Sequence, residues 1–302
     1  PVMPTIQHTV ADEDAGERVD VVLGRRVPGL SRRVARSLAR AGHLRIDGLP
    51  ASAAQRARPG QRLELLLPAS TATPAPPLVV LAVTPRFVYA DKPPGLHTHR
   101  LRPDDPTALA DLVAAAFPEC SDASPDPRER GAVHRLDGGT SGVLAFARDR
   151  DTYLAARAAF SAGAARKRYL AVVTCPEDLV WPGPAQQWRA PIGETLEVHA
   201  PLQSDADPRR MLAGSGQPSV SLVHRPRRRA DGLARVELEL VTGRRHQARV
   251  HLAWLGLPIL GDATYGGAPA DRLYLHAKTL DLGALDPAEA PITAPSPPGF
   301  EP

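Results

Sequence analysis

The sequence predicts an α+β protein in which a small basic module precedes a larger body with a substantial mixed sheet. Three observations support this class. ARVELELVTG, residues 234–243, alternates apolar and charged residues, which is typical of a half-buried strand. SGVLAFARD, residues 141–149, begins with a nearly continuous apolar run, as expected of a strand buried on both faces, and an alanine-rich helix pattern follows it. The third observation is an excess of arginine over residues 16–67.

Residues 16–67 carry most of the positive charge of the 302-residue chain. They hold 11 Arg or Lys against 4 Asp or Glu, a net charge of +7 in a chain whose overall charge is +4. A strongly basic segment predicts a polyanionic partner, of which nucleic acid is the commonest. A solvated charged surface is the alternative.

Two helices and two tight turns are expected within this basic segment. ERVDVVLGRRV, residues 17–27, predicts a short helix, and Ser31 is a natural N-cap for a second helix that Gly42 ends. LRIDGLPA and RPGQRLELLL follow, with Asp-Gly and Pro-Gly turns beside short strands.

Three arginines share one face of the second helix. Arg33, Arg36 and Arg40 recur at three and four residues, on a different face from Val34 and Leu38. A helix, an arginine-rich helix and a small hairpin in this order resemble the RNA-binding module named after the fourth protein of the small ribosomal subunit. This resemblance implies that the three arginines bind RNA phosphates, which adds affinity without reading sequence.

Composition divides the chain into five expected segments. PASTATPAPP, residues 68–77, has the composition of a linker and no core-forming pattern. The expected segments are an N-terminal extension over 1–15, the basic module over 16–67, the linker over 68–77, the larger domain over 78–285 and a Pro-rich tail over 286–302.

Neither membrane nor disulfide signals are present. The chain has no apolar run of about 18 residues, and its first residues are polar and acidic, unlike a signal peptide, which favours the cytoplasm. Cys120 and Cys175 lie far apart without CxxC spacing, so reduced structural thiols are expected. A monomer without a membrane partner is the default expectation.

Asp137 lies in the motif HRLDGGTSG, residues 134–142. The two glycines after it adopt positive φ without cost, so the chain can bend sharply and present the carboxylate. The hydroxyls of Thr140 and Ser141 are expected to cap the bend. Two interpretations stay open at this point: a nucleophile or base in a cleft, or an aspartate that only hydrogen-bonds its own turn.

A second polar cluster lies in TGRRHQARVH, residues 242–251. The expected helix places His246 and Arg249 one turn apart on one face. An arginine there could pair with a buried carboxylate and keep it ionised. The alternative is an exposed helix start whose arginines favour solubility, which suits Arg244 and Arg245 better than Arg249.

The histidines of the chain do not predict a metal site. His134, His246, His251 and His276 show neither HExxH nor paired Cys/His spacing. Because GxGxxG after a strand and the Walker motif are also missing, no nucleotide cofactor is expected.

Five segments occur in an order that resembles a known family. They are DKPPGLHTHR, AVHRLDGGTSGVLAFARD, KRYLAVV, TGRRHQARVHLAWLGLPILGDATYGG and RLYLHAKTLDL. Together they resemble the ribosomal large-subunit, RluA-type branch of the RNA pseudouridine synthases, over nearly the whole chain. The resemblance implies a mixed, mainly antiparallel sheet flanked by helices around a central active-site cleft. It also implies an isomerase that needs neither cofactor nor metal.

The resemblance assigns roles to several residues. Asp137 falls on the catalytic aspartate, Tyr169 on the tyrosine that stacks on the target base, and Arg249 on the arginine that pairs with the aspartate. Leu275, in the LHA motif, is expected to form an apolar wall of the pocket. The remaining residues expected to bind substrate in this domain are His134, Arg135, Thr140 and His246.

The sequence departs from the family pattern at a few positions. Gly138 and Gly139 stand where charged residues are common, and Arg245 and Ala248 replace a small polar and a branched apolar residue. Because glycine freedom must be frozen out on binding, these departures bear on loop stiffness and substrate identity.

A lone carboxylate suits an isomerase that keeps its leaving group, since a glycosidase commonly needs two acids. The expected substrate is a uridine flipped out of RNA. Large-subunit ribosomal RNA is favoured, and transfer RNA stays open. Two other classes are alternatives: a non-catalytic RNA-binding or ribosome-assembly protein, and a nucleosidase-like hydrolase that releases free base.

Overall fold

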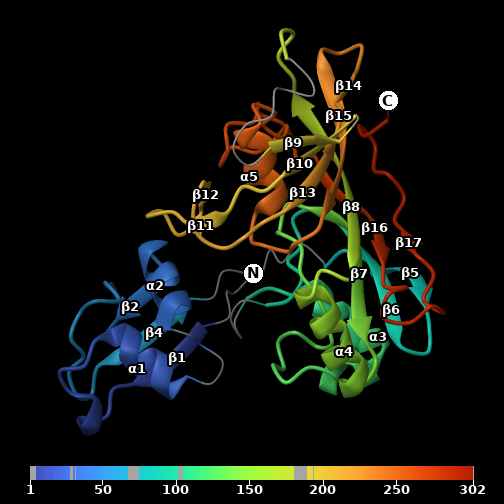
Figure 1. Ribbon diagram of the computed structural model, residues 1–302. Coiled ribbons are helices and arrows are strands. Elements are labelled where there is room, and N and C mark those ends of the chain that lie inside the picture. Colours follow the sequence, from blue (N-terminus) through green and yellow to red (C-terminus); the bar gives the residue numbers. More distant parts are fainter. Residues whose placement is uncertain are drawn as a thin grey trace. The chain divides into compact units, whose positions relative to one another are not determined.

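The computed structural model describes residues 5–27, 30, 32–66, 75–100, 105–179, 189–192 and 194–301. The chain divides into two compact units: Pro1–Ala75 with Arg102–Pro106, and Pro76–Leu101 with Thr107–Pro302 (Figure 1). Most of the expected linker and the expected N-cap Ser31 lie outside the described residues.

The smaller unit is a four-stranded antiparallel sheet with two helices packed on it. The strand order is β1-β4-β2-β3. Its elements are β1 (Thr5–Thr9), the 3-10 helix η1 (Asp12–Asp14), α1 (Val19–Arg26), α2 (Arg32–Arg40), β2 (Leu44–Ile46), β3 (Leu49–Pro50) and β4 (Arg62–Leu66). Asp47 and Gly48, with φ of 50° and 80°, form the expected tight turn between β2 and β3.

Residues 5–15 belong to this unit, so the separate N-terminal extension expected over 1–15 is wrong for its described part. Strand β1 pairs with β4 from Thr5 opposite Leu66 to Thr9 opposite Arg62. Val10 is 2% exposed and lies in the same core as α1 and α2. Residues 5–15 contribute few apolar side chains to this core, so their sequence pattern alone does not predict a strand.

A buried carboxylate holds the two helices of the small unit together. Asp20 of α1 is fully buried and accepts hydrogen bonds from Arg18, at 2.9 Å, and from Arg36 of α2. Burial by itself raises the pKa of this carboxyl, but the hydrogen bonds from Arg18 and Arg36 outweigh it, so the pKa of Asp20 is lowered. One arginine of the expected RNA-binding face therefore also has a structural partner.

Asp20→Asn should lower the free energy of unfolding of the small unit by about 1 kcal/mol, because both arginines remain partly exposed to solvent. Since the pKa of Asp20 is lowered by folding, its contribution is present above pH ~4 and is lost as pH falls below it. Hydrogen exchange of the α1 and α2 amides measures this, with the exposed Asp12→Asn as the control. An equal loss of amide protection in Asp20→Asn at acid and neutral pH would contradict the ion-pair explanation.

The larger unit is built on an eleven-stranded mixed sheet of order β5-β6-β7-β16-β8-β15-β13-β10-β9, with β14 on β15 and β17 on β16. Most pairs are antiparallel, whereas β7 and β16 run parallel. The strands are β5 (Val79–Val83), β6 (Phe87–Lys92), β7 (Ser141–Ala147), β8 (Arg166–Thr174), β9 (Arg189–Ile192), β10 (Thr195–Val198), β13 (Ser221–His224), β14 (Arg227–Arg228), β15 (Leu233–Leu240), β16 (Leu275–Asp281) and β17 (Ile292–Thr293). A separate hairpin pairs β11 (Leu202–Ser204) with β12 (Met211–Ala213).

Helices cover the two faces of this sheet unequally. Buried residues of α3 (Leu109–Ala116) and α5 (Gln247–Trp254) share one core with β8 and β15. Buried residues of α4 (Arg150–Ser161) share a second core with β6 and β7. Strand β7 contributes to both cores and is buried at every position, which confirms the expectation for residues 141–147.

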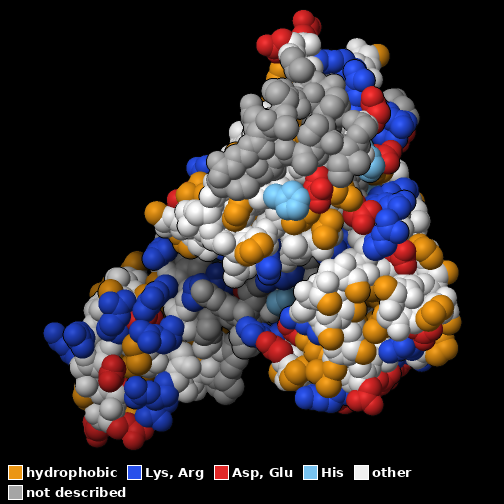
Figure 2. Space-filling model, viewed as in Figure 1, with side chains coloured by type: hydrophobic (Ala, Val, Ile, Leu, Met, Phe, Trp, Pro, Cys, Tyr) orange, Lys and Arg blue, Asp and Glu red, His pale blue; other side chains and the backbone are white. Residues whose placement is uncertain are grey.

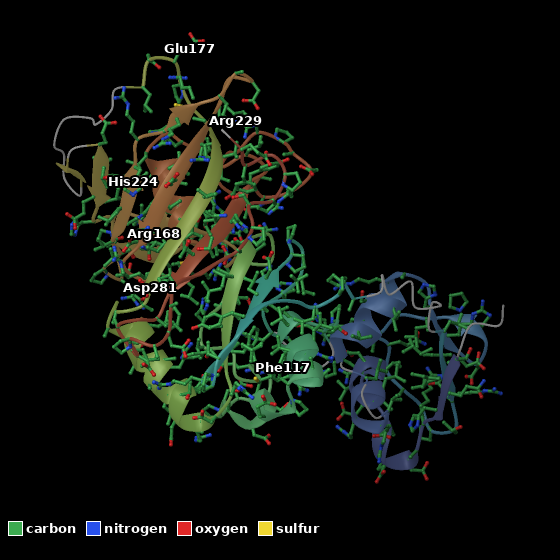
Figure 3. The ribbon with its side chains drawn as sticks, turned by 90° about the vertical axis from the view of Figure 1, so that its right-hand side faces the viewer. Phe117, Arg168, Glu177, His224, Arg229 and Asp281 are labelled. Carbon is green, nitrogen blue, oxygen red and sulfur yellow. The ribbon has the colours of Figure 1, made fainter. Side chains whose placement is uncertain are left out.

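Part of the second face carries charged side chains. Arg166 and Arg168 of β8 lie within ion-pair distance of Glu239 on β15. Figure 3 shows Arg168 and His224 over the strands on this face. The functional groups described below come from the other face and from the end of β7.

The C-terminal residues complete the sheet, so the separate tail expected over 286–302 is wrong. Strand β17 pairs with β16, with Leu280 opposite Ile292. Phe300 is 1% exposed and packs with Leu170 and Val172 of β8. The sequence did not indicate this role, because the segment is rich in proline and buries single side chains without a periodic pattern.

Candidate active site

Asp137 lies in a tight turn immediately before β7, in the middle of the sheet. The amide of Thr140 donates a hydrogen bond of 3.0 Å to the carbonyl of Asp137 and closes a four-residue turn. The side chain of Asp137 is 22% exposed. A carboxylate therefore reaches solvent at the end of a strand whose own residues are completely covered.

The glycine with positive φ near this motif lies inside β7, not in the turn that follows Asp137. Gly138 and Gly139 do not have positive φ, whereas Gly142 has φ of 114°. A Cβ on Gly142 would lie 2.2 Å from the carbonyl oxygen of Ala277 on β16. The expected cap from Ser141 is also wrong, because its hydroxyl accepts from Arg272 at 2.6 Å. The close parallel approach of β16 explains the need for glycine at residue 142, since it leaves no space for a side chain there.

The segment before α3 holds the turn from outside. The hydroxyl of Thr98 donates to the carbonyl of Leu136 at 3.1 Å and accepts from its amide at 3.0 Å. The ammonium of Lys92 is fully buried and donates to three carbonyls, those of Pro93, Leu96 and Gly138. Burial lowers the pKa of Lys92 to about 7, and the charge of Asp137 partly opposes this.

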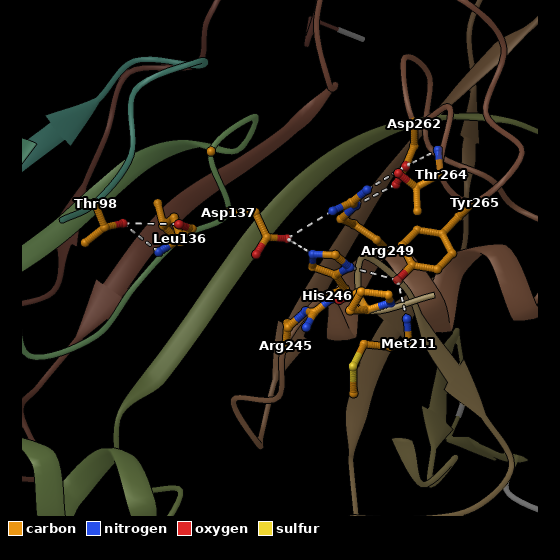
Figure 4. A network of polar contacts seen from close by, with 12 residues as sticks. Thr98, Leu136, Asp137, Met211, Arg245, His246, Arg249, Asp262, Thr264 and Tyr265 are labelled. Carbon is orange, nitrogen blue, oxygen red and sulfur yellow. Dashed lines mark hydrogen bonds and ion pairs between the residues drawn. The ribbon is translucent and has the colours of Figure 1, made fainter. Parts of the chain in front are cut away.

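Arg249 on α5 is shared between two carboxylates (Figure 4). Its Nε and Nη2 donate to the two oxygens of Asp262 at 2.7 and 2.8 Å, and its Nη1 lies 3.4 Å from Oδ2 of Asp137. Asp262 is 2% exposed. The bidentate pair with Asp262 orients the guanidinium, so that one edge remains for Asp137.

His246 also approaches Asp137, but not from the helix as expected. Helix α5 begins at Gln247, and His246 is its N-cap, with φ of 55° and ψ of 15°. The prediction that His246 and Arg249 share a helical face is therefore wrong, because a residue with left-handed backbone lies outside the helix. Its Nε2 nevertheless lies 3.9 Å from Oδ2 of Asp137. Burial lowers the pKa of His246, although Asp137 opposes this.

An apolar wall lies beside these charges. Tyr169 of β8 is 7% exposed and belongs to one core with Leu136, Leu275 and Ala277. Burial, with a smaller contribution from the charge of Asp137, raises the pKa of Tyr169, so its phenol stays protonated at neutral pH. The structure thus brings Asp137, Tyr169 and Leu275 to one region of the molecule, as the sequence predicts.

Other predicted substrate-binding residues of this unit have different surroundings. The ring of His134 stacks on Phe160, with centroids 4.7 Å apart, and its Nε2 accepts from the amide of Ala145. Burial lowers the pKa of His134 to about 3, so this imidazole is neutral. Arg135 is exposed, and Thr140 is buried in the turn. Only Arg135 among these three presents an accessible charge.

The three predicted RNA-binding arginines belong to the small unit. Arg36 and Arg40 help to line a depression of about 400 Å³ on that unit. Arg33 pairs with Asp105 at 2.9 Å. Figure 2 shows arginine side chains gathered over the surface of this unit. Two of the three side chains are therefore partly neutralised within the chain, and Arg40 is exposed.

Three residues at the site were not predicted: Lys92, Asp262 and Tyr265. All three lie inside segments that carried the family resemblance, DKPPGLHTHR and GDATYGG. Their roles depend on contacts with residues far away in the chain, so local pattern could mark the segments but not the side chains. Within the described residues no group of three or more His, Cys, Asp or Glu is arranged to hold a metal. Over the same residues, no helix has both the length and the apolar character needed to cross a bilayer.

Comparisons with known proteins agree with this architecture. The model of the RNA pseudouridylate synthase family matches residues 86–254, and that of the S4 domain matches residues 17–63. An uncharacterized RNA pseudouridine synthase of Mycobacterium bovis is 33% identical over 90% of this chain and 87% of that protein. The ribosomal large subunit pseudouridine synthase D of Xanthomonas campestris is 33% identical over 96% of this chain and 88% of that protein.

A solved human structure, RNA pseudouridylate synthase domain containing 4, has a TM-score of 0.52 at 23% identity, over 74% of this chain and 90% of that chain. The class is therefore the pseudouridine synthase fold, preceded by a small S4-like α/β module. The chain belongs to the RNA pseudouridine synthases, in their RluA-type branch, and carries an S4 RNA-binding domain.

Lys92→Met should change how stability depends on pH. Because folding lowers the pKa of Lys92 from ~10.4 to about 7, its buried charge destabilises the fold below pH ~7, and the cost disappears above pH ~10. The free energy of unfolding of the wild type should therefore rise by on the order of a few kcal/mol relative to that of Lys92→Met as pH rises through this window. Denaturant unfolding at several pH values measures the difference.

Lys278→Met is the matched control, since this lysine also donates to a backbone carbonyl, that of Ala294, but is only partly buried. The lowered pKa of Lys92 would be contradicted if the stability difference between wild type and Lys92→Met did not change with pH. It would also be contradicted if Lys278→Met showed the same pH dependence.

Proposed function

We propose that this chain converts uridine to pseudouridine in large-subunit ribosomal RNA, with Asp137 as the reacting carboxylate. The observation that supports this most is the convergence of Arg249 and His246 on Asp137 beside the apolar core that contains Tyr169. The substrate class is supported by relatives such as the ribosomal large subunit pseudouridine synthases D of Xanthomonas campestris and Xylella fastidiosa.

The chemistry follows from one accessible carboxylate, because the other acid beside Arg249, Asp262, is buried and bound to that arginine through both oxygens. The bond between N1 of uracil and C1′ of ribose breaks, after Asp137 either attacks C1′ or removes a proton from C2′. The base then rotates in the pocket and C5 bonds to C1′. This step expels the Asp137 carboxylate in the first route, and in the second route the proton returns to C2′. C5 finally loses its proton to solvent, and N1 gains one. Water is not consumed, which is why a second acid to activate it is not needed.

Arg249 and Tyr169 have separate tasks in this proposal. Arg249 neutralises and orients the carboxylate while its own direction is set by Asp262. Tyr169 stacks on the uracil, and its protonated phenol is available to relay the final proton. His134, Arg135, Thr140, His246 and Leu275 remain as proposed substrate-binding residues, of which the exposed Arg135 suits a phosphate.

The test is tritium release from RNA labelled at C5 of uridine. Wild type should release tritium to water from a large-subunit ribosomal RNA transcript, whereas Asp137→Asn should lose at least 10³-fold of the rate and still bind RNA. Transfer RNA and ribosomal particles are tested in parallel. Release from transfer RNA alone would overturn the proposed substrate, and activity of Asp137→Asn would overturn the role of the carboxylate.

The two alternative classes give different products in the same assay. A nucleosidase-like hydrolase would release free uracil, which chromatography separates from tritiated water. A non-catalytic RNA-binding or ribosome-assembly protein would bind RNA without releasing tritium from any substrate.

Arg40→Ala should weaken RNA binding through the small unit. Because Arg40 is exposed beside a depression, losing one phosphate contact should reduce the slope of log Kd against log salt by about one. Titration of labelled RNA at several salt concentrations measures the slope. Arg128→Ala is the control, since Arg128 is exposed and paired with Asp126 in the larger unit. An unchanged slope for Arg40→Ala would show that this face does not contact phosphate.

A further inference from the structure

Tyr265 lies at the centre of the polar network around Asp137 without touching the carboxylate itself (Figure 4). Its hydroxyl is 2.8 Å from Nδ1 of His246 and accepts the amide of Met211 at 2.9 Å. The guanidinium of Arg249 lies over its ring, 5.0 Å from the centroid. Both groups that approach Asp137 therefore also contact this one tyrosine.

A tight turn places Tyr265 and Asp262 on the same arginine. The amide of Tyr265 donates to the carbonyl of Asp262 at 3.2 Å, and the amide of Gly267 donates to the same carbonyl at 2.9 Å. Arg249 is consequently held by the carboxylate of Asp262 and by the ring face of Tyr265. This arrangement leaves the Nη1 edge of Arg249 directed at Asp137.

The hydrogen bonds of Tyr265 favour one tautomer of His246. The Tyr265 oxygen already accepts the Met211 amide, so its single hydrogen is available for His246. If the hydroxyl donates to Nδ1, the neutral imidazole must carry its hydrogen on Nε2, the nitrogen 3.9 Å from Oδ2 of Asp137. A donor is then directed toward the carboxylate and toward a ligand bound there.

The same hydroxyl connects the site to the hairpin of β11 and β12. Met211 begins β12, and its amide is bonded to Tyr265. A second link runs beside it, from the guanidinium of Arg245 to the carbonyl of Pro208 in the loop of this hairpin. Arg209 in that loop is largely exposed, and its guanidinium pairs with Asp207 at 2.8 Å, so a polyanion that binds Arg209 competes with that carboxylate.

We propose that Tyr265 is a positioning residue: it holds His246 in the Nε2–H form and Arg249 against Asp137, and it ties both to the β11–β12 hairpin. RNA contacts on the hairpin are thereby coupled to the geometry of the carboxylate. This inference rests on the proposed function of Asp137, and its test includes readouts made without RNA.

The decisive variant is Tyr265→Phe, which removes the hydroxyl and keeps the ring under Arg249. Histidine ¹⁵N spectra of the full chain, with His246 assigned from His246→Gln, report the tautomer. The wild type should show the Nε2–H form. Because the lost bond favours neutral imidazole, the pKa of His246 should rise in Tyr265→Phe, its tautomer preference should disappear, and the Met211 amide should exchange faster.

Activity on tritiated RNA supplies the second readout. Tyr265→Phe should lose about ten- to a hundredfold in kcat with KM unchanged, and the acid limb of its pH profile should move to higher pH. Tyr274→Phe is the matched control, because it removes a hydroxyl bonded to the exposed Asp271. The control should match the wild type in every readout.

The outcomes separate this inference from the proposed function. An Nδ1–H form in the wild type, or an unchanged His246 tautomer and pKa in Tyr265→Phe, would overturn the positioning role. A fall in kcat without a shift of the pH profile would also overturn it, since that indicates only structural damage. A wild type that releases no tritium from any RNA would refute the proposed function, and the tautomer comparison would still decide the state of His246.

Discussion

The arrangement of the site depends on the sharing of Arg249 between Asp262 and Asp137. A guanidinium has donors for two carboxylates, and the bidentate pair with the buried Asp262 occupies one edge of it. The remaining edge meets Asp137 at 3.4 Å, a looser contact than the pair with Asp262. The looser contact leaves the carboxylate of Asp137 partly exposed to solvent while a positive charge stays beside it.

The sheet places Asp137 where this arginine can reach it. Strand β7 is buried on both faces and runs parallel to β16. The turn that holds Asp137 is therefore attached directly to a fully buried strand. The parallel approach leaves no space for a side chain at Gly142. Lys92 and Thr98 then hold the turn through backbone carbonyls, which do not depend on the identity of the residues in the turn. Two glycines can therefore follow Asp137 in an ordered turn, because the hydrogen bonds from Lys92 and Thr98 hold the backbone of that turn.

Charge serves two different purposes in the two units. In the small unit the buried Asp20 uses Arg18 and Arg36 to join its helices, and only part of the arginine surface is left for a polyanion. In the larger unit the charges of Asp137 and Arg249 lie beside the apolar core that contains Tyr169, where burial strengthens their effect on pKa. Arginine therefore joins the helices of the small unit through Asp20 and lies beside the partly exposed carboxylate of Asp137 in the larger unit.

The sequence by itself determined the class of fold, the basic module and the strand at 141–147, and its family resemblance predicted Asp137, Tyr169, Arg249 and Leu275 as site residues. These features follow from local periodicity and from motifs that are contiguous in the chain. The tertiary structure alone decided that His246 lies outside the helix and that residues 5–9 and 292–293 pair into the two sheets. It alone decided that Lys92, Asp262 and Tyr265 support the site. Those features depend on contacts between segments far apart in the chain, and a one-dimensional pattern does not encode which donor meets which acceptor.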